Sequence, residues 1–370
     1  MDKRTGGYIR RAGVVIGVGV LVLLGWTGYR LWQAWSDVER VAFDPSAARV
    51  ALEGTDPARV DYEPIPDEDI APDPGPIVEG DLAQEADEYA TARSRSVNEA
   101  VEAFLIIGSD QRAEIGASRR ADVILLFVLP ADKGDPLLVS IPRDLYLPNP
   151  CSGGLSRVNA NLNGCGDFAT GPEQLAVAVE DFTGIEIDHF AVFDFDGFRA
   201  IIDRVGGVEV CTEYPLRDLN VTPTQLQIPA GCSTIGGDMA LSWVRSRKTQ
   251  EQVGGVWRTQ ASVNDLARNQ RQQDLIIQAL SRLKDFRDIS ELTALVEELS
   301  SAFTIDDRLT LGQAIGTAWS LRSLDLTRIV RPVLAVANFI DPNGAYVLVP
   351  SKSFEEVVVE ADPSAAALFS

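Results

Sequence analysis

Short apolar runs recur along the chain beyond Val97, and polar segments rich in Gly, Pro and Asp separate them. Such runs predict buried β-strands, whereas apolar residues spaced three and four apart predict helices. The sequence predicts strands at 102–110, 121–130, 135–148, 189–195, 208–211, 327–335 and 345–350. It predicts helices at 171–184, 196–207, 262–284 and 307–324. Strands that alternate with helices indicate a layered α/β domain around a largely buried sheet.

Turn-forming residues support several of these boundaries. Pro172 lies in the first turn of the helix predicted at 171–184, and Gly184 lies at its end. The pair Gly206 and Gly207 is expected to end the next helix. His189 is the only histidine of the chain and begins a predicted strand, so we expect it to have a structural role.

The N-terminal region has the pattern of a membrane span. The segment from Ala12 to Tyr29 contains no charged residue, and as a helix it would be about 27 Å long, close to the thickness of a hydrocarbon core. Arg30 can snorkel, and three tryptophans suit an interface belt, namely Trp26, Trp32 and Trp35. We therefore expect a transmembrane helix over residues 12–35.

Basic residues precede this span and predict its orientation. By the positive-inside rule, Lys3, Arg4, Arg10 and Arg11 keep residues 1–11 in the cytoplasm. The expected product is a single-pass protein of the cell membrane whose remaining residues are extracytoplasmic. A cleaved signal peptide is the alternative, but bulky Trp, Tyr and Leu residues stand where a small-residue cleavage site would lie.

Residues 36–96 are expected to form an acidic, Pro-rich extracytoplasmic linker. Residues 51–90 contain thirteen Asp or Glu and a single basic residue, Arg59, and they show no helical or strand period. The remaining chain is expected to divide into one large folded domain at 97–360 and a tail at 361–370.

The overall charge limits the choice of ligand. The formal net charge is −21, whereas a protein that binds DNA or RNA normally presents a basic face. We therefore expect no nucleic-acid partner. A local group of arginines on so acidic a chain instead indicates a small anionic ligand.

The four cysteines are expected to form disulfides in an oxidising compartment. Four cysteines allow three pairings, and proximity along the chain favours Cys151 with Cys165 and Cys211 with Cys232. A zinc site is the competing interpretation, but the chain has no CxxC pair and a single histidine.

Charged residues gather at the ends of the predicted strands and on one later helix. The groups are Asp110 with Arg112, Arg119 and Arg120 with Asp122, Arg143 with Asp144, and Arg245, Arg247, Arg268 and Arg271. Arg245 and Arg247 are expected on one face of a strand, and Arg268 and Arg271 on one face of a helix. Arginine forks match phosphate oxygens, and paired carboxylates suit Mg²⁺. Salt bridges at the rim of the sheet are the alternative, although ligands of open α/β sheets bind at this edge.

Seven segments together resemble the LytR-CpsA-Psr family in sequence and in order. They are FLIIGSDQR, RRADVILLFVLP, LVSIPRDLYLP, SRVNANL, IDHFAVFDFDGFRAIIDRVGGVEV, GDMALSWVRSRK and RNQRQQD, within about residues 100–350. The resemblance implies a three-layer α/β/α sandwich with a central mixed sheet and an apolar pocket for a lipid chain. It implies a membrane-anchored phosphotransferase that moves a glycopolymer from a polyprenyl-pyrophosphate carrier to peptidoglycan.

The resemblance also implies roles for individual residues. Asp110 and Asp122 match the carboxylates associated with Mg²⁺ (or Mn²⁺), and Arg120 joins them as a catalytic residue. The arginines that match pyrophosphate-binding positions are Arg120, Arg143, Arg245, Arg247, Arg268 and Arg271. Asp110 or Asp122 is also expected to accept the proton of the acceptor hydroxyl, and the sequence does not distinguish the two.

The chain departs from the family pattern at one point. Residues 248–264, with Trp257 and Arg258, stand where family members often have a short acidic connection, which makes the acceptor less certain than the donor chemistry. Two other functions stay open: a hydrolase that cleaves the same lipid pyrophosphate with water, and a non-enzymatic envelope module that binds lipid or polyanion.

Overall fold

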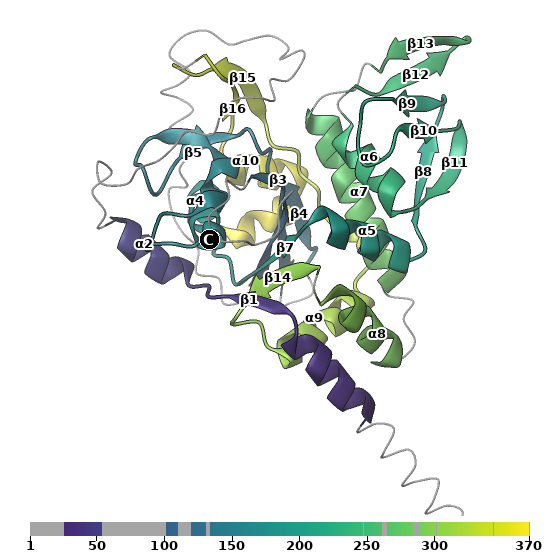
Figure 1. Cartoon of the computed structure of the whole chain (residues 1–370). Coiled ribbons are helices and arrows are strands. Elements are labelled where there is room, and N and C mark those ends of the chain that lie inside the picture. Colours follow the sequence, from purple (N-terminus) through teal and green to yellow (C-terminus); the bar gives the residue numbers. More distant parts are fainter. Residues whose placement is uncertain are drawn as a thin grey trace, which may run out of the picture.

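Six strands form a mixed sheet at the centre of the molecule (Figure 1). The structure is a computed structural model that describes residues 26–53, 101–109, 120–130, 134–246, 248–260, 265–283, 289–300, 302–342 and 344–369. Across the sheet the strands are β1 (Glu39–Val41), β14 (Phe303–Asp306), β7 (His189–Phe193), β2 (Val101–Ser109), β3 (Ala121–Pro130) and β4 (Leu137–Ser140). β1 is parallel to β14 and β7 is parallel to β2, whereas the other neighbours are antiparallel. The predicted α/β fold with a central mixed sheet is confirmed.

The two faces of this sheet pack differently. Leu105 and Ile107 of β2 are fully buried, whereas Ile106 between them is half-buried. Successive side chains of a strand point to opposite faces. Leu105 and Ile107 pack with residues of α4 (Gly171–Thr183) on what we call the α4 face. Ile106 packs with residues of α7 (Asp265–Leu283) on the α7 face.

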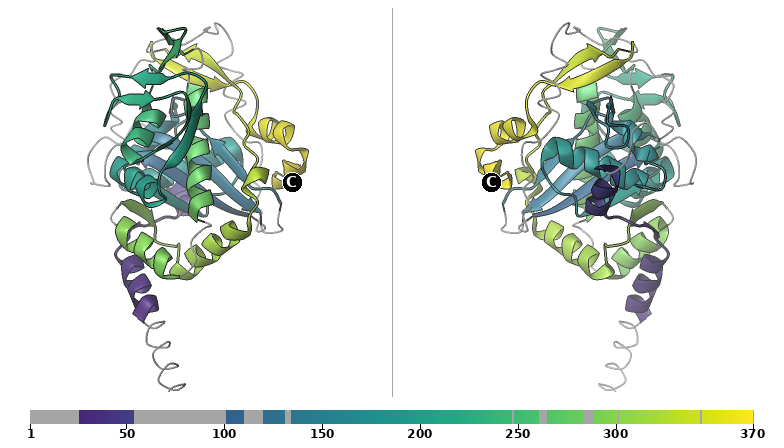
Figure 2. Two further views of the ribbon diagram at one scale, coloured as in Figure 1. Left: turned by 90° about the vertical axis from the view of Figure 1, so that its right-hand side faces the viewer. Right: turned by 90° about the vertical axis from the view of Figure 1, so that its left-hand side faces the viewer.

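Helices cover both faces of the sheet (Figure 2). Besides α4 and α7, the helices are α2 (Pro45–Glu53), α5 (Phe195–Arg204), α6 (Gly237–Arg245), α8 (Ile289–Leu299), α9 (Leu311–Ser323) and α10 (Phe354–Ala361). The 3₁₀ turns are η2 (Val158–Asn163), η3 (Leu326–Arg328) and η4 (Pro363–Leu368). The boundaries of α4 follow the turn chemistry of the sequence. Thr170 and Glu173 form a capping box at its start, and Gly184 is left-handed at its end.

Smaller sheets flank the central one. One has four strands in the order β10 (Leu226–Ile228), β9 (Leu216–Asp218), β12 (Gln250–Val253) and β13 (Val256–Thr259). Three strand pairs are β8 (Val208–Thr212) with β11 (Gly231–Ile235), β5 (Tyr146–Pro148) with β6 (Leu155–Arg157), and β15 (Val336–Ile340) with β16 (Tyr346–Pro350).

Both predicted disulfides are present, Cys151–Cys165 and Cys211–Cys232. The first is buried and packs with Ala48 and Leu52 of α2. The second joins residues that lie directly opposite each other on β8 and β11, and it is exposed.

The N-terminal boundary of the domain differs from the predicted one. Residues 36–96 were expected to be a linker, but residues 39–41 form β1 at the edge of the central sheet. Residues 45–53 form α2, which packs on α4. The sequence pattern did not reveal β1, because the strand is short and β14, with which it pairs, lies far along the chain. Residues 54–100 lie outside the described residues.

Two further elements correct the sequence prediction. The segment around Arg245 was expected to be a strand, but it is the end of helix α6. The short run Leu241–Val244 also fits a helix that is buried on several sides, and all four residues are buried here. Residues 327–335 were expected to form a strand, but they are a 3₁₀ turn and an extended segment, and the strand β15 begins at Val336.

Residues 26–36 are helical and lie at the same end of the domain as α8 and α9 (Figures 1 and 2). Leu31 and Ala34 are buried, and Arg30 pairs with Glu297 of α8 through its Nε at 2.8 Å. No helix within the described part of the chain is long and apolar enough to cross a bilayer. Most of the predicted span at 12–35 lies outside that part.

Candidate functional site

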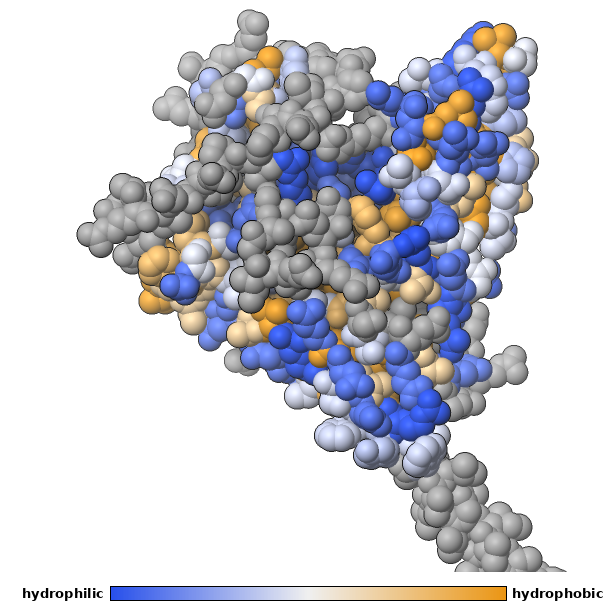
Figure 3. All heavy atoms as spheres, in the orientation of Figure 1, coloured by the Kyte–Doolittle hydropathy of each residue, from blue (hydrophilic) through white to orange (hydrophobic). Residues whose placement is uncertain are grey.

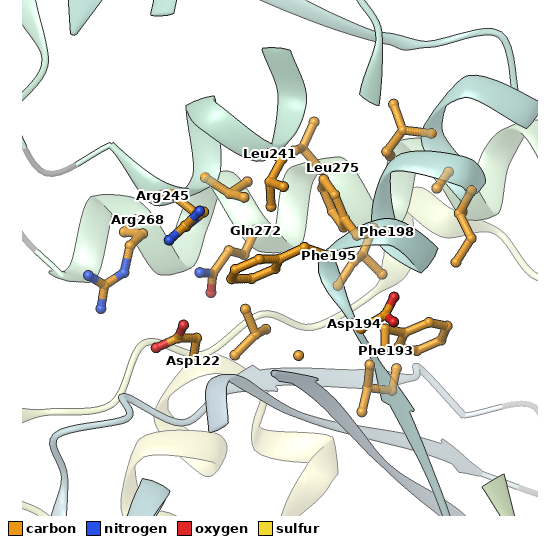
Figure 4. Close-up of a pocket in the computed structure, with 18 of the residues that line it drawn as sticks. Asp122, Phe193, Asp194, Phe195, Phe198, Leu241, Arg245, Arg268, Gln272 and Leu275 are labelled. Carbon is orange, nitrogen blue, oxygen red and sulfur yellow. The ribbon is translucent and has the colours of Figure 1, made fainter. Parts of the chain in front are cut away.

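A cavity of about 460 Å³ lies between the α7 face of the sheet and helices α5, α6 and α7. Most of its wall is apolar. Ile106 and Val123 come from the sheet, Phe195 and Phe198 from α5, and Leu275 from α7. In Figure 4 the two phenylalanines and Leu275 surround the middle of the cavity.

The polar groups of the cavity gather at one end. Asp122 lies across from Arg245 and Arg268, and Gln272 lies beside them (Figure 4). Arg143 also lines the cavity. Asp194, at the other end, caps α5 because its carboxylate accepts the backbone N–H of Gly197. Four predicted site residues, Asp122, Arg143, Arg245 and Arg268, are thus brought together from four separate segments.

An irregularity in the sheet directs Asp122 into the cavity. Val123 is paired with Gly108, but Ala121 is paired with Ser109, so Asp122 is an extra residue on β3. A bulge of this kind re-aims side chains and is common beside functional sites. As a result, both Asp122 and Val123 line the cavity. A Cβ atom at Gly108 would lie 3.0 Å from that of Val123, so glycine permits this close approach.

Arg143 holds the Asp122 carboxylate. Its Nη1 donates to Oδ1 of Asp122 at 2.7 Å, and its Nε lies 3.4 Å from Oδ2 of Asp144. The Arg143 side chain is 8% exposed, whereas that of Asp122 is 29% exposed. The turn after β4 fixes Arg143, because its backbone oxygen accepts the N–H of Asn159. The salt bridge expected as an alternative therefore exists, but it lies inside the cavity.

Arg245 is positioned by contacts that leave its charge without a carboxylate partner among the described residues. Its guanidinium lies 4.4 Å from the centre of the Phe195 ring. Its Nη1 lies 3.2 Å from Oγ1 of Thr222. The side chain is exposed at the polar end. A guanidinium held in this way is prepared to bind an anion.

Arg268 and Arg271 differ in position although both belong to α7. Arg268 lines the cavity, whereas Arg271 stacks on Trp243 of α6 at 4.0 Å and donates to Oε1 of Gln260 at 3.1 Å. Burial, and to a lesser extent the charge of Arg268, lowers the pKa of Arg271 to about 10. Arg271 thus does not line the cavity beside Arg268, and its role as a pyrophosphate ligand stays a prediction. Arg271 instead supports the connection between α6 and β12.

Gln272 lines the cavity but was not among the predicted site residues. Its place on α7 could have been found from the sequence. Arg268, Gln272, Leu275, Ile276 and Ala279 all line the cavity. Their spacing of four, three, one and three residues marks one face of a helix. Phe195 and Phe198, three apart on α5, carry the same kind of signal.

The other predicted residues have different outcomes. His189 begins β7, is buried, and its Nδ1 lies 3.0 Å from Oδ1 of Asp306, which fits its expected structural role. Arg120 directly precedes β3 and is not part of the cavity lining. Asp110, Arg112, Arg119 and Arg247 lie outside the described residues.

Comparison with known proteins gives one family. The model of the LytR_cpsA_psr family matches residues 78–361. The probable cell wall biosynthesis protein LcpB of Corynebacterium glutamicum is 36% identical over 174 residues, which is 43% of this chain and 39% of that protein. The Bacillus subtilis protein TagV, named a polyisoprenyl-teichoic acid–peptidoglycan teichoic acid transferase, is 25% identical over 262 residues, or 69% of this chain and 62% of TagV. The chain thus spans about two fifths and three fifths of these relatives.

Solved structures agree on the fold. The crystal structure of B. subtilis TagV superposes with a TM-score of 0.57 at 20% identity and covers 74% of this chain and 98% of its own. At this identity the superposition supports the fold alone.

Proposed function

Because the chain belongs to the LytR-CpsA-Psr family, we propose that it is a phosphotransferase that moves a glycopolymer from a polyprenyl-pyrophosphate carrier to peptidoglycan. One observation carries the proposal. A single cavity combines a long apolar wall with three arginines and one carboxylate at one end. A lipid pyrophosphate has the same division, with an apolar chain and an anionic head.

The residues divide the work between the two ends of the cavity. The lipid chain would lie along Ile106, Phe198 and Leu275, where its burial is favourable. The pyrophosphate would lie at the polar end, where arginine forks bind phosphate oxygens. Arg245 and Arg268 are the side chains best placed to contact it. The other predicted arginines keep their proposed roles as further pyrophosphate ligands: Arg120, Arg143, Arg247 and Arg271.

The polar end also fits a divalent cation. Mg²⁺ prefers one or two carboxylates together with phosphate oxygens and water. Asp122 supplies a carboxylate that Arg143 fixes in place, and Asp110 is the proposed second ligand. When bound, Mg²⁺ or Mn²⁺ would offset the charge that develops on the phosphate oxygens.

The proposed reaction is a transfer of the glycosyl phosphate. A sugar hydroxyl of the acceptor attacks the phosphorus atom that carries the glycan, and a new P–O bond forms. The P–O bond to the polyprenyl phosphate breaks, and the leaving group takes the electron pair. Arg245 and Arg268 stabilise this charge, and the hydroxyl proton passes to Asp122 or Asp110.

The decisive experiment mixes purified full-length protein with a lipid-pyrophosphate glycan, Mg²⁺ and peptidoglycan fragments, followed by mass analysis. We expect fragments that have gained a glycosyl phosphate, together with free polyprenyl phosphate, and EDTA should abolish both. Free glycosyl phosphate alone would identify a hydrolase. Donor binding without turnover would identify a binding module.

We also propose an N-terminal membrane anchor with the domain outside the cell. The helix at 26–36 exposes Trp26, Tyr29 and Trp32, which suit a membrane interface, and the two disulfides suit an oxidising compartment. Protease added to intact spheroplasts should digest the domain. Complete protection would contradict the proposed topology.

A further inference from the structure

The four-stranded sheet β10-β9-β12-β13 presents one polar face with an unusual composition. Residues paired directly across neighbouring strands have side chains on the same face. The register pairs Arg217 with Gln227 and with Gln250, Gln250 with Thr259, and Gln252 with Trp257. The outer face, as we call it, therefore consists of Arg217, Gln227, Gln250, Gln252, Trp257 and Thr259.

The opposite face of this sheet packs against helix α6. Leu216, Leu226 and Ile228 are buried in a cluster with Trp243 and Val244 of α6. Since side chains alternate along a strand, the outer face points away from α6. Its residues are half-buried or exposed, and the lobe that carries them is mostly hydrophilic in the view of Figure 3.

Arg217 is held at the centre of the outer face. Its guanidinium stacks 4.1 Å from the centre of the Trp257 ring, and its Nε donates to Oε1 of Gln250 at 2.8 Å. No carboxylate pairs with Arg217 among the residues that the structure describes. In a chain with a net charge of −21, a fixed guanidinium without an acidic partner is available to an outside ligand through its Nη groups.

The chemistry of the outer face matches a sugar chain. An indole packs on pyranose rings, amides and a hydroxyl exchange hydrogen bonds with sugar hydroxyls and N-acetyl groups, and a guanidinium binds a carboxylate. All four kinds of group are present, and none of the six residues is acidic. Peptidoglycan offers N-acetylated sugars together with carboxylates.

We infer that the outer face binds the glycan strands of peptidoglycan and holds the polymeric acceptor beside the enzyme. The inference rests on the proposed function for the identity of the acceptor. A face that points away from α6, a wall of the cavity, cannot position a small acceptor for reaction. A polymer can contact the outer face with one segment and enter the polar end of the cavity with another.

Co-sedimentation of the full-length protein with peptidoglycan sacculi tests this inference. The sacculi are first stripped of attached wall glycopolymer. We expect Arg217→Gln and Trp257→Ala each to weaken binding about tenfold, because each removes a charge-assisted or stacking contact. Arg258→Gln is the matched control, since Arg258 lies opposite Glu251 on the other face of the same hairpin. It should bind as the wild type does.

Several outcomes would overturn the inference. One is unchanged affinity of the Arg217→Gln variant, and another is an equal loss in the Arg258→Gln variant. Binding only to sacculi that still carry glycopolymer would show that the face recognises that polymer instead. Transfer of the glycosyl phosphate to soluble peptidoglycan fragments, measured in parallel, tests the proposed function separately from binding to sacculi.

Discussion

Both faces of the central sheet carry apolar side chains, but these side chains have different surroundings on the two faces. On the α4 face, Leu105 and Ile107 are fully buried against helices. On the α7 face, Ile106 and Val123 border a cavity. The strands supply both faces with apolar residues, but part of the α7 face borders open space, whereas the helices fill the space beside Leu105 and Ile107.

This difference separates stability from function within one sheet. A filled face gains free energy from burial and close packing. An apolar face beside a cavity gives up part of that gain and provides a surface for a ligand. Substitutions on the two faces should therefore have different readouts.

The largest expected effect is on the α4 face. Leu105→Ala should lower the free energy of unfolding by about 3 kcal/mol, because the side chain is fully buried and leaves a void. Urea denaturation measures the loss. Turnover per folded molecule should stay near that of the wild type at temperatures well below unfolding, and a large fall in turnover would contradict the separation of the faces.

The second effect belongs to the polar end of the cavity. Arg245→Lys keeps the charge but removes the arginine fork, so turnover should fall about 100-fold, or about 2.7 kcal/mol in activation free energy. Because Arg245 is exposed, the free energy of unfolding should change by less than about 0.5 kcal/mol. Donor consumption and a thermal melt are measured together.

Arg322→Lys is the control for Arg245→Lys, because Arg322 is also exposed and stacks on an aromatic ring, that of Trp319. Its turnover should equal that of the wild type. Equal turnover in both lysine variants would place the pyrophosphate site elsewhere.

A third, smaller effect distinguishes the two arginines of α7. Arg271→Lys should lower the free energy of unfolding by about 1–2 kcal/mol, because it loses the stack on Trp243 and the bond to Gln260. Turnover should fall much less than in Arg268→Lys. If Arg271→Lys had the larger effect on turnover, the arrangement of α7 would need revision.

The lowered pKa of Arg271 also predicts a dependence on pH. The folded state binds this proton less tightly than the unfolded state, so charging Arg271 reduces stability at neutral pH. That cost should be relieved as the pH rises above about 10. Stability curves of the wild type and Arg271→Gln, compared from pH 9 to 11, should diverge in favour of the wild type.

The smallest expected effect compares neighbouring residues of β2. Ile107→Val should cost about 1 kcal/mol in a filled core, whereas Ile106→Val should cost less than about half of that beside the cavity. Chemical denaturation measures both. Equal costs would mean that the α7 face is as tightly filled as the α4 face.

The sequence predicted those helices and strands that each contain a long pattern of apolar residues. Strands β2 and β3 and helices α4 and α7 have long apolar patterns, and α4 has both of its end signals. Strand β1 could not be found in this way, because three residues carry no period and their partner β14 lies far along the chain. Helix α6 was mistaken for a strand because a short apolar run does not distinguish the two.

The sequence predicted the charged residues at the polar end of the cavity, but it did not predict how their side chains are oriented. Asp122, Arg143, Arg245 and Arg268 line one cavity, since two strand ends, the end of helix α6 and one face of α7 bring them together. Arg271 does not line the cavity with them. Residues three apart point about 60° apart around a helix, and the side chain of Arg271 stacks on Trp243. The bulge at Asp122 depends on pairing between strands, which spacing along one strand does not reveal.

The strand β1 also sets how the domain bears force. It is the edge strand of the central sheet and follows directly on the helix at 26–36. A pull on the N-terminus runs along β1, so its hydrogen bonds to β14 share the load in shear instead of opening one after another. If the chain is anchored in the membrane and binds peptidoglycan as proposed, tension between the membrane and the peptidoglycan passes through the central sheet. The distance from membrane to cavity is then set by folded structure and not by the length of a loose tether.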